Sequence, residues 1–448
     1  MVEATTKSTA RPHDPVLASF EEFDRAGQGS TPSWLQALRK GGIAHFAELG
    51  FPTTKHEEWR FTNVAPIART TWTLADGTGK ASEKDVLTNI FPDVPGKRIV
   101  FVDGRFSKEL SSKELSSGTQ TPTGLRIQSV YDAVRSTNPL VMHSLARYAR
   151  YDENPFAALN TAFVNDGAVI IAPTRFVATE PVYILYLSTA SKPNTVTHPR
   201  TLIVAQRDSQ LKVIEHHVTL GSATCFTNAV TEIVLEESAT VEHCKVQDES
   251  LNAYHIATIQ TQQASKSHLL SHSISIGGAI TRNNINCVLD GERLECTLNG
   301  LYIGRDSQVV DHHTAIFHNK PNCNSHEFYH GILDGKSQGV FNGKIFVRPE
   351  AQKTDAKQTN RNLLLSDEAT MDTKPQLEIF ADDVKCTHGA TIGQLDPESI
   401  FYLRARGIGL EVARKMLLHA FASEIVNRIS IEPVRERLDS KLFDMYER

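Results

Sequence analysis

From about residue 160 to residue 393, the chain consists of short apolar stretches separated by small polar groups. Val, Ile, Thr and aromatic residues dominate these stretches, for example at residues 201–205 and 239–246. Runs of this kind predict β-strands, because branched and aromatic side chains fit a pleated surface. We find no convincing amphipathic helix pattern in this part of the sequence.

The polar corners between these stretches recur at a nearly constant interval. Those that open successive strands lie at Ser209, Ser238, Ser265 and Gly291, about 29, 27 and 26 residues apart, and later ones lie at Ser307 and Ser337. A loose period of this length, with strands and no helix, predicts a right-handed parallel β-helix whose coils stack on one another. A β-sandwich or jelly roll remains open, because Asn299-Gly300 and Asn342-Gly343 are typical of hairpin turns.

The sequence on both sides of the strand-rich region is helical in character. Before it, helical spacing covers residues 20–25, 31–50 and 130–151, a short strand covers 98–104, and residues 1–15 predict a disordered tail. After it, Asp396-Pro397-Glu398 predicts a helix start with an acidic N-cap, and Gly407 predicts the end of that helix. We therefore predict a mainly β protein with an α-rich N-terminal domain (1–155), a β-helix (156–395) and a C-terminal helical domain (396–448).

Two further helices are predicted after Gly407, and each is half apolar. The first places Ala413, Met416, Leu417, Ala420 and Phe421 on one face, and the second runs through Val434, Leu438, Leu442 and Met445. Such helices either cap the open end of the β-helix or dock a partner protein. The pattern alone favours neither role.

Composition and charge exclude several classes of function. Of the residues, 40% are hydrophobic and 22% are charged, and the net charge is −5. No basic excess points to nucleic acid, and no polybasic run points to a membrane surface. No stretch approaches the roughly 18 apolar residues of a membrane span, and the N-terminus lacks the apolar segment of a secretory signal. Together with six cysteines that form no CxxC pair, this predicts a cytoplasmic protein with reduced thiols.

Motifs for nucleotide and hydrolase chemistry are missing from the sequence. There is no GxxxxGK[ST], no GxGxxG after a strand, no HExxH and no GxSxG. We therefore expect a non-catalytic chain without a bound nucleotide, so any ATP hydrolysis in the process must come from another protein.

A local concentration of histidines is the first candidate site. His312, His313, His318, His326 and His330 lie within 19 residues of one another. Neutral imidazoles suit zinc or iron, which would allow a stand-alone metal-binding protein. However, the spacing matches no closed tetrahedral site, and strand alternation sends His312 and His313 to opposite faces. Hydrogen-bonded histidines, on the surface or in a ladder, are the favoured interpretation.

Cys386 and His388 form the second candidate site. On a strand, residues two apart face the same side, so the thiol and the imidazole should lie together. An imidazolium near a thiol lowers the thiol pKa and favours the thiolate, which binds soft metals. Two ligands are too few for an iron–sulfur cluster, so a partner would have to supply the others. A buried cysteine beside a hydrogen-bonded histidine is the alternative.

An enzyme acting on polysaccharide is a competing interpretation, because many such enzymes are β-helices. Asp382 and Asp383 with Lys385 would then form a lyase or hydrolase site. The absence of an export signal and the small number of aromatic residues argue against it.

Several motifs in the segment 338–396 resemble the SufB/SufD family. They lie at residues 339–344, 355–365, 375–379 and 382–391, and the resemblance continues through 404–408 and 413–414. Looser matches lie upstream, at residues 57–60 and 154–167. The chain looks more like SufD than SufB, because Thr387 and Gly389 stand where SufB-type chains carry acidic residues beside the corresponding histidine. The Trp59-Arg60 segment also suits SufD.

The resemblance implies a scaffold subunit of the SufBCD complex for iron–sulfur cluster assembly. It implies a β-helix between two helical domains, pairing with a SufB-type subunit through the β-helix, and docking of the SufC-type ATPase on the C-terminal helices. The docking candidates are Arg404, Arg406, Gly407, Ala413, Arg414, Met416 and Leu417. His388 matches the family histidine implicated in building a transient cluster shared with the SufB-type partner, and Cys386 matches the neighbouring cysteine. A homodimer is expected where that partner is missing, because a β-helix edge would be exposed.

Overall fold

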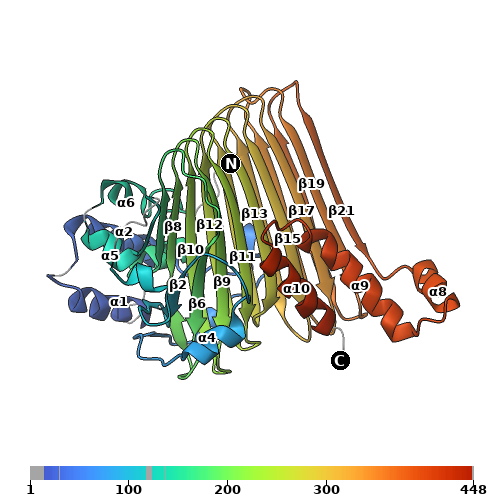
Figure 1. Ribbon diagram of the computed structural model, residues 1–448, viewed down its shortest axis with the longest axis horizontal. Helices are drawn as coiled ribbons and strands as arrows, with labels where there is room; N and C mark the ends of the chain where they lie inside the picture. The colour runs from blue at the N-terminus through green and yellow to red at the C-terminus, as the bar shows by residue number, and fades with distance from the viewer. Residues whose placement is uncertain (1–14, 30, 118–123, 137, 446–448) are drawn as a thin grey trace.

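The structure is a computed structural model that describes residues 15–29, 31–117, 124–136 and 138–445. The predicted tail at residues 1–15 lies, apart from Pro15, outside the described residues. Figure 1 shows a β-solenoid with helices at both ends of the chain. No helix among the described residues is long and apolar enough to cross a membrane.

Helices and short strands make up the first third of the described chain. The helices are α1 (Pro15–Ala26), α2 (Ser33–Leu49), α3 (Ala65–Arg69), α4 (Glu83–Asn89), α5 (Val130–Arg135), α6 (Pro139–Ser144) and α7 (Pro155–Ala162), with 3-10 turns at Glu57–Trp59 and Lys113–Ser117. The strands are β1 (Thr73–Leu74), β2 (Lys97–Val102), β3 (Arg105–Phe106) and β4 (Arg126–Ser129). The predicted helix at 31–50 and strand at 98–104 are therefore confirmed, whereas the pattern at 130–151 yields two short helices.

Seventeen strands follow, at β5 (Ala168–Ala172), β6 (Val182–Ser188), β7 (Thr195–Thr197), β8 (Arg200–Ala205), β9 (Gln210–Thr219), β10 (Cys225–Leu235), β11 (Thr240–Glu249), β12 (Ala253–Gln263), β13 (His268–Gly277), β14 (Ile280–Leu289), β15 (Glu295–Gly304), β16 (Val309–His318), β17 (Asn324–Leu333), β18 (Gln338–Val347), β19 (Asp355–Leu364), β20 (Thr370–Ile379) and β21 (Lys385–Gly393). They belong to an 11-stranded sheet, which we call sheet A, and a 10-stranded sheet, sheet B, and from β8 onward they alternate between the two.

Sheets A and B form a parallel β-solenoid, as predicted. Sheet A runs β20-β18-β16-β14-β12-β10-β8-β5-β4, and beside this path β7 pairs with β10 and β1 pairs with β7. Sheet B runs β21-β19-β17-β15-β13-β11-β9-β6-β2-β3. Every pair from β5 to β21 is parallel; only β2–β3 and β4–β5 are antiparallel. This rules out the sandwich and jelly roll, whose strands pair antiparallel. Strand β2 pairs with β6, so a strand of the N-terminal third extends sheet B. The predicted boundary between the N-terminal domain and the β-helix near residue 155 stays a prediction.

The two Asn-Gly pairs are not turns. Asn299-Gly300 lies inside β15 and Asn342-Gly343 inside β18. At Gly300 a Cβ would lie 2.1 Å from the ring of Tyr329, so this glycine makes room for a buried ring. The Asn-Gly pairs, which kept the sandwich open as an alternative, therefore do not mark hairpins, because close packing inside the solenoid selects the same residue as a tight turn does.

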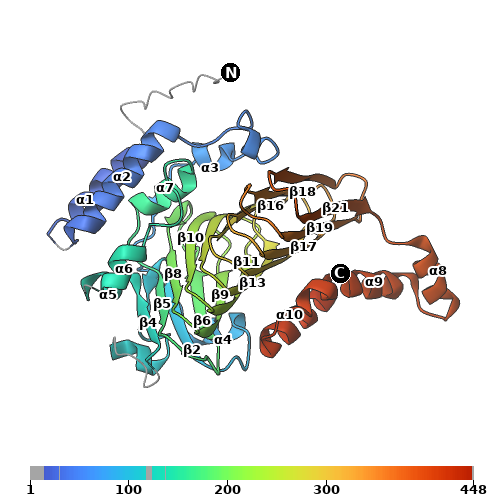
Figure 2. The same cartoon turned by 90° about the horizontal axis from the view of Figure 1, so that it is seen from above.

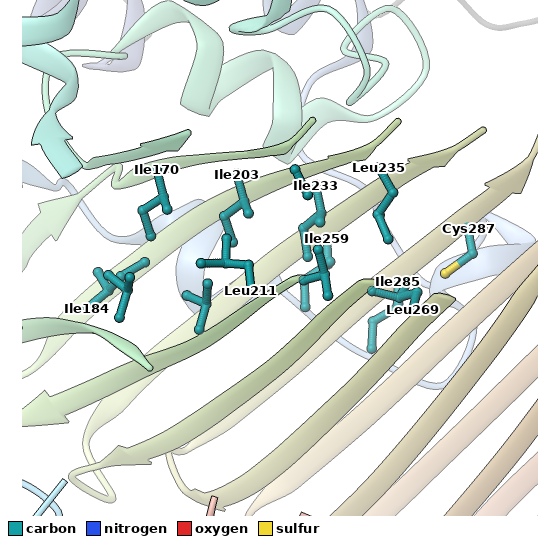
Figure 3. Close-up of a cluster of buried hydrophobic side chains, with 14 of the residues drawn as sticks. Ile170, Ile184, Ile203, Leu211, Ile233, Leu235, Ile259, Leu269, Ile285 and Cys287 are labelled. Carbon is teal, nitrogen blue, oxygen red and sulfur yellow. The ribbon is translucent and has the colours of Figure 1, made fainter. Parts of the chain in front are cut away.

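Aliphatic side chains from both sheets fill the first coils of the solenoid. Figure 3 shows these inward-facing residues: Ile170, Ile203, Ile233, Ile259 and Ile285 from sheet A, and Ile184, Leu211 and Leu269 from sheet B. Ile203 is in register with Ile170 and Ile233, and Ile259 with Ile285, so these side chains stack. Between β10 and β12 the column shifts by two residues, because Ile259 is in register with Thr231. Burying each such side chain contributes about 1.5–3 kcal/mol.

Helices α2, α5, α6 and α7 cover the outer face of sheet A, whereas α4 packs on the outer face of sheet B. The side-chain amide of Asn160 in α7 donates to the backbone carbonyls of Pro199 and Asn228 on the sheet. Helix α2 packs closely on α7: a Cβ at Gly42 would lie 2.6 Å from the backbone nitrogen of Ala162. This face of the solenoid is therefore not available to a partner near α7 (Figure 2).

Three helices follow the last strand: α8 (Pro397–Ala405), α9 (Leu410–Val426) and α10 (Glu432–Met445). The Asp396 carboxylate caps α8 by accepting the N–H groups of Glu398 and Ser399, and Gly407 ends it with φ +87°, as predicted. Helix α10 and the second half of α9 lie on the outer face of sheet B, whereas α8 and the start of α9 extend away from it (Figures 1 and 2). The helices therefore cover a side of the solenoid and do not cap its open end.

The apolar face predicted for the first of these helices is partly wrong. Ala413 is buried, but Met416 is 42% exposed and Leu418 is buried instead. The buried positions Leu418, Ala422 and Ile425 lie where α9 meets sheet B, because only that half of the helix touches the sheet. The face predicted for the last helix is confirmed by the buried residues Val434, Leu438 and Leu442.

Candidate functional site

The last coil of the solenoid is open. Strands β20 and β21 pair on one side with β18 and β19, and no described strand pairs with their outer edges. Nearly all residues of β21 are exposed, and the apolar side chains of Phe380 and Ile392 are about half exposed. An edge strand of this kind offers a row of backbone N–H and C=O groups for pairing with another chain.

Cys386 and His388 lie on the inward face of this last coil. Cys386 is in register with Ala356, and His388 with Gln358, and both partners on β19 are buried inside the solenoid. Register-matched residues of a parallel ladder share one face, so the thiol and the imidazole point to the same side, as predicted. Cys386 is half buried against apolar residues such as Leu377, whereas His388 is exposed.

The surroundings of Cys386 disfavour the thiolate. Burial raises the pKa of the Cys386 thiol, and the Asp355 carboxylate adds to this rise. The expectation that His388 would lower the thiol pKa is therefore wrong for the isolated chain. Desolvation acts on the half-buried sulfur, and the carboxylate of Asp355 is negative, so both disfavour a second negative charge. A metal ion or a partner surface would have to change these surroundings before the thiolate forms.

A buried polar pair lies directly behind His388. The Gln358 side-chain amide donates from Nε2 to the Glu327 carboxylate, and both residues are nearly inaccessible to solvent. Burial raises the pKa of Glu327 to about 7, although hydrogen bonds from Gln358 and Thr314 oppose the rise. The sequence analysis did not find this pair. A signal was present in the alternation of β17 and β19, which places both residues among inward positions.

The group of histidines is not brought together. His312 and His318 face the inside of sheet A, where they contact the hydroxyls of Ser275 and Ser325. His326 and His330 lie on the outer face of sheet B. No cluster of three or more His, Cys, Asp or Glu residues able to hold a metal ion occurs in the described part of the chain. A shared metal site at these histidines thus gains no support, whereas the opposite faces of His312 and His313 are confirmed, because His313 pairs outside with Glu58 at 3.3 Å.

The acidic residues of the polysaccharide interpretation lie at an exposed corner. Asp382 and Asp383 lie in the turn between β20 and β21, and the Asp383 carboxylate pairs with Lys353 of the neighbouring corner. Lys385 opens β21 and is exposed. This arrangement provides an ion pair at the surface and not two carboxylates facing a substrate groove.

The docking candidates lie on α8, on the turn after it, and on the first half of α9. Arg404, Arg406, Gly407 and Arg414 are exposed, and the Arg406 guanidinium lies 4.6 Å from the ring centre of Tyr402. Leu417 is half buried, and Ala413 is the one buried member of the set. Met416, another member of the set, is exposed, and so are the nearby apolar side chains of Phe401, Tyr402, Leu410 and Val412.

The Trp59-Arg60 segment is held on the outer face of sheet A. The guanidinium of Arg282 lies 3.7 Å from the ring centre of Trp59 and 2.9 Å from the buried carboxylate of Asp311. Thr62 also donates to Asp311. The motif therefore joins the N-terminal segment to the solenoid through a buried cation and its counterion.

All six cysteines are unpaired. Cys225, Cys244, Cys287, Cys296 and Cys323 are buried, and only Cys386 is partly accessible. Cys386 is therefore the one thiol that an incoming metal ion or partner can reach without unfolding of the solenoid.

Two protein-family models match the chain. The model of the SufBD protein N-terminal region matches residues 15–184, and the model of the SUF system FeS cluster assembly, SufBD core domain, matches residues 186–421. The chain belongs to the SufB/SufD family of iron–sulfur cluster assembly proteins, which confirms the resemblance seen in the motifs.

Individual relatives align over nearly the whole chain. An iron–sulfur cluster assembly SufBD family protein of Synechocystis is 33% identical over 92% of this chain and 91% of its own length. The iron–sulfur cluster assembly protein SufD of Escherichia coli is 31% identical, with 94% of each chain covered. The SufD protein of Bacillus subtilis is 26% identical, with 95% of each chain covered. The chain is thus similar to proteins named SufD from two bacteria.

Proposed function

We propose that this chain is a scaffold subunit that pairs with a SufB-type subunit through β20 and β21 and helps to build an iron–sulfur cluster at that interface. The observation that carries the proposal is the open last coil, which presents two unpaired strand edges with Cys386 and His388 on its inward face. Family membership supplies the reaction in which this surface would act.

Cys386 and His388 would form half of the assembly site. A thiolate and an imidazole are both suitable ligands for iron in a cluster, but two ligands cannot complete one. The partner would supply the others, and the cluster would be a transient product passed on to other proteins. Because burial raises the pKa of the Cys386 thiol, metal binding would have to displace its proton.

A SufC-type ATPase would dock on α8 and the first half of α9. This part of the chain extends from the solenoid and exposes large apolar side chains such as Phe401, Val412 and Met416. An exposed apolar surface of this kind is typical of a protein interface. Nucleotide would be bound by the ATPase and not by this chain.

The helices would transmit movement of the ATPase to the site. In α9, the backbone carbonyl of Phe421 lies 3.0 Å from Nδ1 of His330 on β17, and Glu424 pairs with Arg361 on β19 at 3.3 Å. Strand β19 is the direct neighbour of β21. A displacement of α9 would therefore reach the last coil over two strands and shift the population of interface states.

A cleavable thiol cross-linker that bridges Arg361→Cys and Glu424→Cys would test this coupling, with the two single variants treated in the same way as controls. If the helix transmits movement, the cross-linked double variant should lose ATP-dependent cluster assembly and recover it when the linker is cleaved. Unchanged assembly in the cross-linked form would contradict the coupling.

The unpaired cysteines bear on the cellular location, and the open strand edges bear on the oligomeric state. Six unpaired cysteines suit a reducing compartment, so we infer a cytoplasmic location. Without the SufB-type subunit, the exposed edges of β20 and β21 would pair two copies of this chain. Size-exclusion chromatography with light scattering would detect that homodimer.

Reconstitution of the complex tests the proposed function. The chain would be co-expressed with its SufB-type and SufC-type partners and supplied with iron and sulfide, and cluster formation would be followed by absorbance. His388→Ala should reduce assembly, whereas His268→Ala, which removes another exposed histidine of sheet B, should not. Equal assembly by His388→Ala and wild type would refute the role of the site.

A further inference from the structure

Four inward-facing residues of sheet B form a column that ends at His388. Leu298 on β15 is in register with Glu327 on β17, Glu327 with Gln358 on β19, and Gln358 with His388 on β21. Neighbouring members of such a column lie about 4.8 Å apart along the sheet. The column therefore places a buried carboxyl and a buried amide directly behind the exposed imidazole.

Only the nitrogen of the Gln358 side-chain amide has a hydrogen-bond partner among the described residues. Its Nε2 donates to the Glu327 carboxylate, but its Oε1 is buried and has no partner among the described residues. Leaving a buried amide oxygen without a donor costs free energy, so such atoms generally have a partner. The next residue in the column is His388, whose ring makes no hydrogen bond or ion pair with another described residue.

The opposite sheet fixes where the amide can lie. Gly343 of β18 faces the interior, and a Cβ there would lie 2.1 Å from Nε2 of Gln358. Any side chain at this position would push the amide away from Glu327. The position of the Gln358 amide is therefore set by its hydrogen bond to Glu327 and by the space above Gly343.

We propose that Gln358, held by Glu327 and Gly343, is a positioning residue for His388: its Oε1 accepts the N–H of one ring nitrogen and fixes the tautomer. The other ring nitrogen then presents its lone pair outward, toward iron at the interface. Histidines that bind metals usually donate their second N–H to a carbonyl or carboxylate in this way. This inference rests on the proposed function, because it assigns His388 a ligand role.

A purely structural role for the pair would leave His388 unaffected. The distinguishing readout is the ring ¹⁵N spectrum of histidine-labelled protein at a pH where the imidazole is neutral, with the His388 signals assigned by their loss in His388→Ala. In the wild type, one ring nitrogen should be protonated and the other not. In Gln358→Met, the two resonances should move toward a common average, because the tautomers exchange. An unchanged spectrum in Gln358→Met would overturn the proposal.

Two variants of Glu327 separate the effect of its hydrogen bond to Gln358 from the effect of its side-chain shape. Glu327→Gln keeps an acceptor for Nε2 and should retain the wild-type signature, whereas Glu327→Leu should lose it. Glu327→Leu with a wild-type signature would contradict the part assigned to Glu327.

Gly343→Ala keeps Gln358 but displaces its amide, so it should lose the signature even if Gln358→Met does not fold. Asn362→Leu is the matched control, because it removes another inward-facing amide of β19 that is in register with Ile392 and not with His388. The control should retain the signature, and its loss there as well would show a general disturbance of the last coil and overturn the specific role of Gln358.

Assembly on the complete complex gives the functional consequence. Loss of a hydrogen bond that orients a metal ligand typically weakens metal binding or activity about 10–100-fold, so Gln358→Met should slow cluster formation by about tenfold or more. Assembly at the wild-type rate would overturn this step. If His388→Ala assembles normally, the proposed function fails. If only the Gln358→Met spectrum and rate are unchanged, the positioning role alone fails.

Discussion

Leu438→Ala is the sharpest test of how the C-terminal helices are anchored. Leu438 lies in α10, is 1% exposed and packs in the apolar cluster between the helices and sheet B. Truncation of a buried leucine to alanine costs about 2–5 kcal/mol, with the larger values where a cavity remains. Leu438 already borders a cavity of about 90 Å³ that Val246 and Ile276 also line. Asp248 and Lys441 also line this cavity, so water can enter the space that the truncation leaves, and we expect about 2–3 kcal/mol, near the lower end of that range.

Hydrogen exchange measured by mass spectrometry would locate this loss. Because 1.4 kcal/mol corresponds to a factor of ten, amides of α10 and of the second half of α9 should exchange roughly 30- to 140-fold faster. Amides of β9 to β19 should keep their protection, because their hydrogen bonds do not depend on the helices.

Leu410→Ala is the matched control, since Leu410 lies in the first half of α9 and is 38% exposed. Leu410→Ala should change the free energy of opening of these amides by no more than about 0.5 kcal/mol. The reasoning is refuted if Leu438→Ala leaves α10 unchanged, or if it accelerates exchange equally throughout the solenoid.

Two further predictions concern buried charges. Burial by itself raises the pKa of Glu242, but hydrogen bonds from His272 and Ser430 outweigh it and lower the pKa to about 2. The folded pKa lies below the unfolded one, so this stabilisation is present above about pH 4.5 and is lost as pH falls toward 2. Urea midpoints of Glu242→Gln should therefore fall less steeply over this range than those of wild type, and parallel curves would contradict the assignment. Arg282→Met should lower the free energy of unfolding by about 3–5 kcal/mol, because it leaves the buried carboxylate of Asp311 without its counterion. Arg207→Met, which breaks an exposed pair with Glu237, should cost less than about 1 kcal/mol, and equal urea midpoints for the two variants would argue against the buried pair.

The solenoid could be predicted because its evidence is local and repeated. Corners such as Ser238 and Ser265 recur at a steady interval, and each strand shows its own alternation. The Asn-Gly pairs suggested hairpin turns that do not exist. Gly300 is a glycine because the ring of Tyr329, on the next strand of sheet B, packs against it, and a pattern within one strand does not contain this contact.

The candidate site was predicted in part. The shared face of Cys386 and His388 follows from strand alternation alone. The raised pKa of the Cys386 thiol depends on burial and on Asp355, which lies on another strand. The pair Glu327 and Gln358 becomes visible only once the register between coils is known. The exposed position of Met416 likewise depends on where α9 leaves sheet B, and no periodicity within the helix contains that information.

The central proposal is that the open last coil pairs with a SufB-type partner, and a hydrogen-exchange footprint of the assembled complex tests this pairing most directly. Hydrogen exchange of this chain would be compared alone and with its SufB-type partner. We expect strong new protection of the amides in β20 and β21, because their free edges would pair with the partner, and little change in β9 to β13. Unchanged exchange in β20 and β21, with protection elsewhere on the solenoid, would contradict it.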